Sequence, residues 1–115
     1  MDPLEGGSTG RPNEFRIAPP EAPVFPMTGL ELARRIDAIA RSEPRTRRLA
    51  GAPETGLTTY LQRSAVMKFP DYVSVRVIEV EGGATVAIWS RARFGYGDMG
   101  VNEARVMRWL GSVER

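Results

Sequence analysis

The chain reads YVSVRVIEVEGGATVAIWSRARF over residues 72–94, and this segment carries the strongest structural signal in the sequence. Apolar and polar residues alternate on both sides of a Gly-Gly pair, which is typical of two strands joined by a tight turn. Glycine supplies the positive φ angles that a two-residue primed turn needs, so we expect Gly82 and Gly83 to form the loop. Glu81 then pairs with Ala84, and this pairing fixes the register of the predicted hairpin.

This register gives the hairpin two different faces. The apolar face, which we expect to pack in the core, comprises Val73, Val75, Val77, Val86 and Ile88. In this register Val77 lies opposite Ile88, and on the other face Arg76 lies opposite Trp89, where guanidinium and indole can stack. The second face belongs to the open face of the whole sheet, which we interpret as a contact surface comprising Tyr60 from the preceding strand, Tyr72, Arg76, Trp89 and Arg91. The alternative is a solvated face, or one covered by the Pro-rich N-terminal segment.

Helical patterns lie on both sides of the strand-like segments. A helix is expected over residues 28–42, since Thr28 and Glu31 have the spacing of a capping box. A second helix is expected over residues 101–113, with Asn102 as its N-cap. Further strands are predicted at residues 46–50, 57–66, 72–81 and 84–94, with a short edge strand at 14–18.

The order of these elements is (β)-α-β-β-β-β-α. Consecutive strands form an antiparallel meander, and both helices must cover one face of it to bury their apolar stripes. The sequence therefore predicts an α+β fold with a four- to five-stranded antiparallel sheet and two helices packed on one face. We expect one domain over residues 24–115, preceded by a Pro/Gly-rich arm or linker over residues 1–23.

The composition excludes several kinds of chemistry. The 115 residues contain no His and no Cys, which removes Ser-His-Asp and Cys-His catalysis, disulfides and His- or Cys-ligated zinc. We expect no metal and no cofactor. A formal net charge of +2 is too small to indicate a nucleic-acid partner. The sequence also lacks a run of about 18 apolar residues that could span a membrane, so the chain as given is expected to be soluble.

Three motifs resemble a known family. They are YLQRS at residues 60–64, FPD at 69–71 and RFGYGDMGVNEAR at 93–105. They are similar to the Arg-Ser pair, the Phe-Pro-Asp and the terminal Arg-x-Gly-Tyr-x-Asp-x-Gly-x-Asn-x-x-Arg of the bacterial and plastid domain-of-unknown-function family 1499. One departure is Ala92, which stands where many members carry a serine. The resemblance implies an N-terminal hydrophobic helix ahead of the domain, and hence an inner-membrane tether with the domain facing the periplasm.

The polar residues of these motifs form the candidate ligand-binding site. They are Arg63, Asp71, Arg93, Tyr96, Asp98, Asn102 and Arg105. One interpretation is a hydrogen-bonded network that fixes the last helix to the sheet, and another is a site whose arginines bind a carboxylate or phosphate. An enzymatic alternative is a small hydrolase or isomerase that uses Asp71 and Asp98 as a carboxylate pair. Neighbouring arginines oppose it because they disfavour the protonated acid that such a pair requires.

These observations favour a non-enzymatic binding or accessory module that is tethered to a membrane in its natural form. The expected partner is an anionic ligand, a lipid headgroup or a protein. A basic cluster at the end of the first helix and the start of the next strand agrees with an anionic partner; it comprises Arg41, Arg45, Arg47 and Arg48. The alternative is a solvated helix end and strand. A structural scaffold subunit of a membrane complex is a further alternative.

Overall fold

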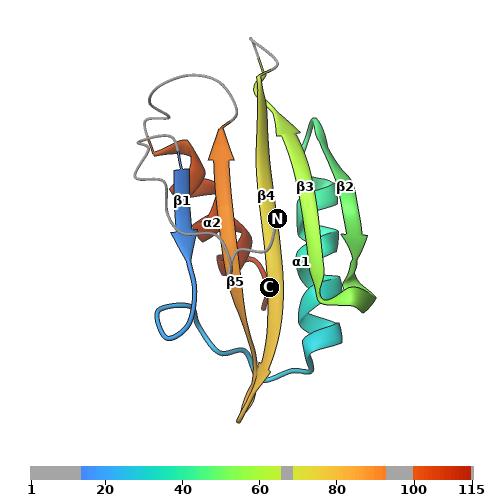
Figure 1. Ribbon diagram of the computed structural model, residues 1–115, viewed down its shortest axis with the longest axis vertical. Coiled ribbons are helices and arrows are strands. Elements are labelled where there is room, and N and C mark those ends of the chain that lie inside the picture. The colour runs from blue at the N-terminus through green and yellow to red at the C-terminus, as the bar shows by residue number, and fades with distance from the viewer. Residues whose placement is uncertain (1–13, 66–68, 93–99, 115) are drawn as a thin grey trace.

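The computed structural model describes residues 14–65, 69–92 and 100–114 (Figure 1). Its elements are β1 (Glu14–Ile17), α1 (Gly29–Ser42), β2 (Thr46–Ala52), the 3-10 helix η1 (Pro53–Thr55), β3 (Leu57–Arg63), β4 (Pro70–Val80), β5 (Gly83–Ala92) and α2 (Val101–Gly111). The strands form one antiparallel sheet in the order β1-β5-β4-β3-β2. The predicted α+β class and element order are therefore confirmed.

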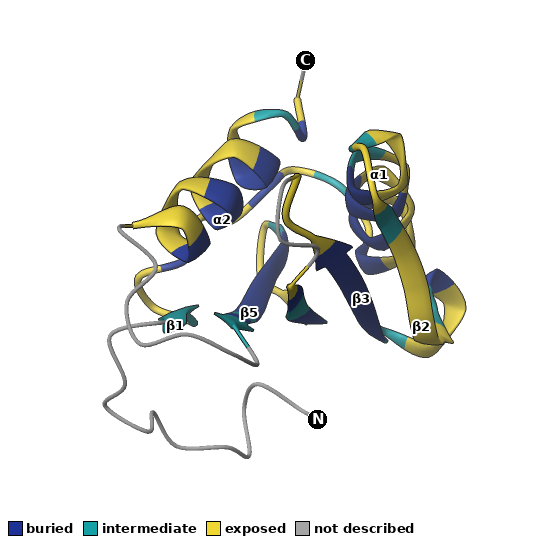
Figure 2. Cartoon of the chain, turned by 90° about the horizontal axis from the view of Figure 1, so that it is seen from above, coloured by how far each residue is buried: buried dark blue, intermediate teal, exposed yellow. Residues whose placement is uncertain are grey.

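Both helices lie on the same face of the sheet, and the core fills the space between the two layers (Figure 2). The side chain of Thr28 accepts a hydrogen bond from the backbone N–H of Glu31 at 3.1 Å, which fixes the start of α1 at the predicted cap. The fully buried side chains of the core come from α1, three strands and α2; the largest are Trp109, Tyr60, Leu32, Ile36, Ile88, Val73, Val86 and Val106. Within the described residues, neither helix is long and apolar enough to cross a membrane.

The hairpin forms, but its predicted register is wrong by two residues. Val80 pairs with Gly83, so the loop consists of Glu81 and Gly82 rather than of the two glycines. A shift of two keeps every side chain on its predicted face. It does change the partners, because Val77 lies opposite Val86 and Arg76 lies opposite Ala87. The predicted stack of Arg76 on Trp89 is therefore wrong.

The reason for this register lies in the N-terminal segment, which runs beside β5. Phe25 forms a bridge with Ala84, with N–H···O distances of 2.8 and 3.0 Å. A Cβ at Gly83, whose φ is +149°, would overlap the carbonyl oxygen of Phe25. Gly83 thus allows two backbones to approach closely and is not part of the turn. Ala22 and Phe25 are both buried in the core.

Candidate functional site

Arg105 lies at the centre of a buried polar network between α2 and the sheet. Its side chain is 5% exposed. Its Nε donates to Gln62 Oε1 at 2.6 Å, and its Nη1 donates to Ser90 Oγ at 3.0 Å and to Asn102 Oδ1 at 2.8 Å. Its Nη2 donates to Asp71 Oδ2 at 2.7 Å. One guanidinium therefore joins α2 to β3, β4 and β5.

The network continues to the end of α1. Gln62 Nε2 donates to Glu43 Oε1 at 2.8 Å and to Thr46 Oγ1 at 2.6 Å. Arg108 binds both oxygens of Glu43, with Nε donating at 2.7 Å and Nη2 at 2.8 Å. Burial alone would raise the pKa of Glu43, but the hydrogen bonds from Arg108 and Gln62 outweigh it and lower the pKa to about 2. Glu43 is the C-cap residue of α1, so this ionised carboxylate links both helices.

The network accounts for three of the residues predicted at the site. Asp71, Asn102 and Arg105 are brought together, and this is the arrangement expected for fixing the last helix to the sheet. Asn102 was predicted to be the N-cap of α2, and this prediction is wrong, because Gly100 occupies that position with φ +81°. The carboxamide of Asn102 is instead fully buried and also accepts a hydrogen bond from Ser90 Oγ at 2.7 Å. The predicted residues Arg93, Tyr96 and Asp98 lie outside the described residues.

The predicted site did not include Gln62, Ser90 and Glu43, although Gln62 lies within the matched YLQRS motif. Gln62 follows the core residue Tyr60 by two positions, and Ser90 follows Ile88 by two, so both lie on the inward face of their strands. A polar residue at an inward position of a strand requires a hydrogen-bond partner, and this is the signal that could have found both.

The network also bears on the proposed carboxylate pair. Asp71 Oδ2 accepts the bond from a guanidinium that is almost fully buried, so this carboxylate serves as the counter-ion of Arg105. Asp71 therefore has a structural role. Asp98, the second carboxylate of the proposed pair, lies outside the described residues. No cluster of acidic residues able to hold a metal ion occurs in the part of the chain that the structure describes.

A groove of about 470 Å³ opens beside the network, at the end of the sheet where β3 ends and β4 begins. Its described lining residues are Glu43, Pro44, Arg45, Gln62, Arg63, Ser64, Ala65, Asp71, Val101, Arg105 and Arg108. This set holds four arginines and two carboxylates, an excess of two positive charges. The field of the groove therefore favours an anion.

The rim of the groove holds Arg45 in an unusual conformation. Arg45 has φ +55°, which lies in the left-handed region that residues other than Gly, Asn and Asp rarely adopt. Two bonds keep it there: the Arg63 N–H donates to the Arg45 carbonyl at 3.0 Å, and Arg45 Nε donates to the Arg63 carbonyl at 3.1 Å. Both arginines are exposed. The connection between α1 and β2 is thus fastened to the end of β3, with two guanidinium-bearing residues side by side.

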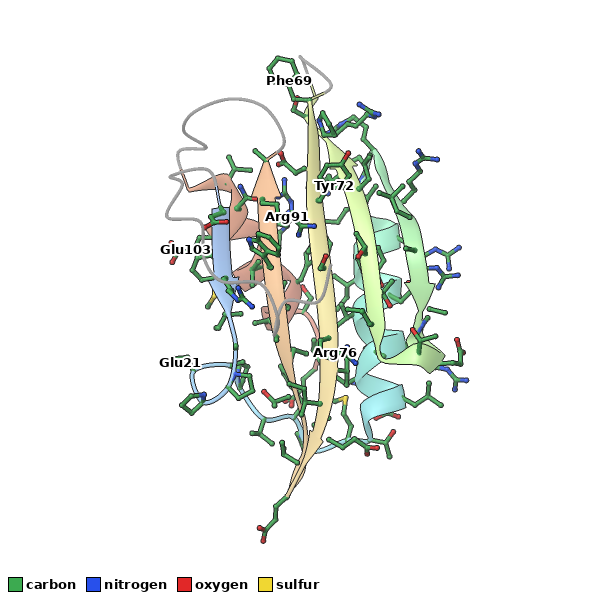
Figure 3. All side chains as sticks on the ribbon, in the orientation of Figure 1. Glu21, Phe69, Tyr72, Arg76, Arg91 and Glu103 are labelled. Carbon is green, nitrogen blue, oxygen red and sulfur yellow. The ribbon has the colours of Figure 1, made fainter. Side chains whose placement is uncertain are left out.

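The face of the sheet opposite the helices carries the predicted aromatic and arginine residues, with one exception. The Arg91 guanidinium lies 4.1 Å from the ring centroid of Trp89 and 5.9 Å from that of Tyr72. The Trp89 indole N–H donates to Glu14 Oε2 at 2.9 Å. Figure 3 shows Tyr72, Arg76 and Arg91 along the middle of this face. Burial lowers the pKa of Arg91.

Tyr60 is the exception, and its predicted place on this face is wrong. It pairs with Val73, so its side chain lies on the core face and is 1% exposed. Its ring meets Trp109 edge-on, with 5.7 Å between centroids, and its hydroxyl donates to Asp37 Oδ1 at 2.8 Å. Burial and the Asp37 carboxylate raise the pKa of this hydroxyl. A tyrosine can occupy the core here because α1 supplies a partner for its polar end.

The fold and the network together define a small α+β domain in which two helices cover one face of a five-stranded antiparallel sheet. The chain belongs to the family described as protein of unknown function DUF1499, whose family model matches residues 10–113. No curated protein matches the chain. Among solved structures it is similar to protein CV1439 from Chromobacterium violaceum, with 11% identity over 90% of this chain and 93% of that chain and a TM-score of 0.47.

Proposed function

We propose that this domain is a non-catalytic binding module that holds an anionic ligand in the groove beside Arg45 and Arg63. The observation that carries the proposal is the left-handed conformation of Arg45 on the rim of a groove with excess positive charge. Such a conformation costs about 1–3 kcal/mol, and strained residues of this kind concentrate at functional sites. A planar guanidinium is suited to bidentate binding of a carboxylate or phosphate.

The other two arginines of the groove lining are already bound to carboxylates of the domain. Arg105 is committed to Asp71 and to the buried network, and Arg108 binds both oxygens of Glu43. These two arginines therefore make the walls of the groove, whereas the exposed Arg45 can reach a ligand. No step of this scheme breaks a bond, so it needs no general acid or base.

We further propose that the natural protein is tethered to the inner membrane with this domain on the periplasmic side. The support is the resemblance of the motifs to a family whose members carry an N-terminal hydrophobic helix.

Calorimetric titration with inorganic phosphate at low ionic strength tests the binding site. The wild-type domain should bind one phosphate, and Arg45→Asn should weaken binding by about tenfold or more, the usual loss for one hydrogen bond to a charged group. Asparagine tolerates left-handed φ, so this variant keeps the backbone of the rim.

Arg47→Gln is the matched control, because it removes the same charge from an exposed arginine of β2 that does not line the groove. It should bind phosphate like the wild type. Equal losses in both variants would show a diffuse charge effect and contradict the site.

A further inference from the structure

Two exposed apolar side chains belong to this end of the domain, one in the groove lining and one on a residue bonded to that lining. Val101 lines the groove at the start of α2 and is 49% exposed, and Phe69 is 43% exposed. Phe69 is tied to the groove wall, because its N–H donates to Ser64 Oγ and its carbonyl accepts from the Ser64 N–H, both at 3.1 Å. Figure 3 shows Phe69 at the tip of this end of the molecule. Among the described residues it is the one aromatic side chain in the exposed class.

We propose that this end of the domain docks on an anionic lipid bilayer, with a headgroup phosphate in the groove and with Phe69 and Val101 in the boundary between headgroups and acyl chains. The proposal rests on the anion-binding function above and names the source of the anion. It commits to a bilayer rather than to a free phosphate or a protein.

Charge and apolarity are arranged here as a bilayer surface requires. Anionic headgroups attract arginines that approach the surface, and the boundary below them accepts aromatic and aliphatic side chains. Arg45 in the groove lining provides the first kind of contact. Val101, also in the lining, and Phe69, which is bonded to the lining residue Ser64, provide the second. A free phosphate would use the arginines but would leave both apolar side chains in water. The grouping of the two kinds of side chain at one end therefore favours the bilayer.

Co-sedimentation with vesicles tests this inference. The wild-type domain should bind vesicles of phosphatidylcholine mixed with phosphatidylglycerol and should not bind vesicles of phosphatidylcholine alone. Binding should fall as salt is added, since salt screens exposed charges. Arg45→Asn should weaken binding to the anionic vesicles about fivefold, the usual effect of one basic residue at such a surface.

Phe69→Ser separates the bilayer from a soluble anion. It should weaken vesicle binding about fivefold through the lost apolar contact and leave phosphate binding unchanged. Phe69→Leu keeps an apolar side chain and should retain most of the binding. Val24→Ser is the matched control, because Val24 is 54% exposed but precedes Phe25, which pairs near the hairpin turn at the other end of the sheet. It should bind vesicles like the wild type.

Three outcomes would overturn the inference. Phosphate binding without vesicle binding would remove the bilayer and leave the anion site in place. Loss of binding to both probes would remove the anion site as well. The third outcome is that Phe69→Ser binds vesicles as tightly as the wild type, or that Val24→Ser weakens vesicle binding as much as Phe69→Ser does. Either result would show that Phe69 makes no specific contact with the membrane.

Discussion

Replacing Arg105 by methionine removes the guanidinium at the centre of the network while keeping a long apolar side chain. Four hydrogen bonds disappear with it. Asp71, whose side chain is 16% exposed, loses its cation, and the fully buried Asn102 loses a donor. Removing one partner of a buried ion pair costs about 3–5 kcal/mol, because the other charge remains without compensation.

Urea unfolding followed by circular dichroism measures this loss. A small domain has an m-value of about 1–3 kcal/mol/M in urea, so the midpoint of Arg105→Met should fall by at least about 1 M. Arg34→Met serves as the control. Its ion pair with Glu54 joins two side chains that are each 62% exposed, and its loss should cost at most about 1 kcal/mol. A midpoint for Arg105→Met within the range of this control would refute the claim that the network fixes α2.

Three further substitutions probe other parts of the fold. Glu43 has a pKa of about 2, below its ordinary 4.5, so its contribution to stability is complete above pH 4.5 and is lost as the pH falls toward 2. Glu43→Gln should therefore flatten the acid side of a curve of stability against pH. An unchanged acid side would contradict this. Tyr60→Phe should cost about 1–3 kcal/mol in urea unfolding by removing the buried bond to Asp37, and a neutral result would argue against that bond. Gly83→Ala should lower the melting temperature far more than Gly82→Ala, since a Cβ at Gly82 meets nothing within 4 Å; equal effects would contradict the close approach at Gly83.

The fold could be predicted because its signals are local. The alternation over β4 and β5 and the cap at Thr28 depend on residues close in sequence, and each appears in the structure. The register of the hairpin could not be predicted in the same way. A glycine pair between strands indicates a turn, whereas Gly83 is required by contact with Phe25, which is far from it in sequence.

The candidate site could be predicted only in part. The predicted site included Asp71, Asn102 and Arg105 but not the further partners Gln62 and Ser90, because a hydrogen-bond network depends on which strands are neighbours. The face of Tyr60 was missed for a related reason. In β3, apolar and polar residues occupy both faces, so alternation alone does not show that Tyr60 points inward. The left-handed conformation of Arg45 has no signal in the sequence at all.

The amide spectrum of the isotope-labelled domain, titrated with inorganic phosphate, tests the anion site most directly. The proposed site predicts saturable shifts confined to the amides of Arg45, Arg63 and Ser64 and their neighbours around the groove. Shifts centred on Trp89 and Arg91, on the opposite face of the sheet, or an unchanged spectrum at millimolar phosphate, would contradict it.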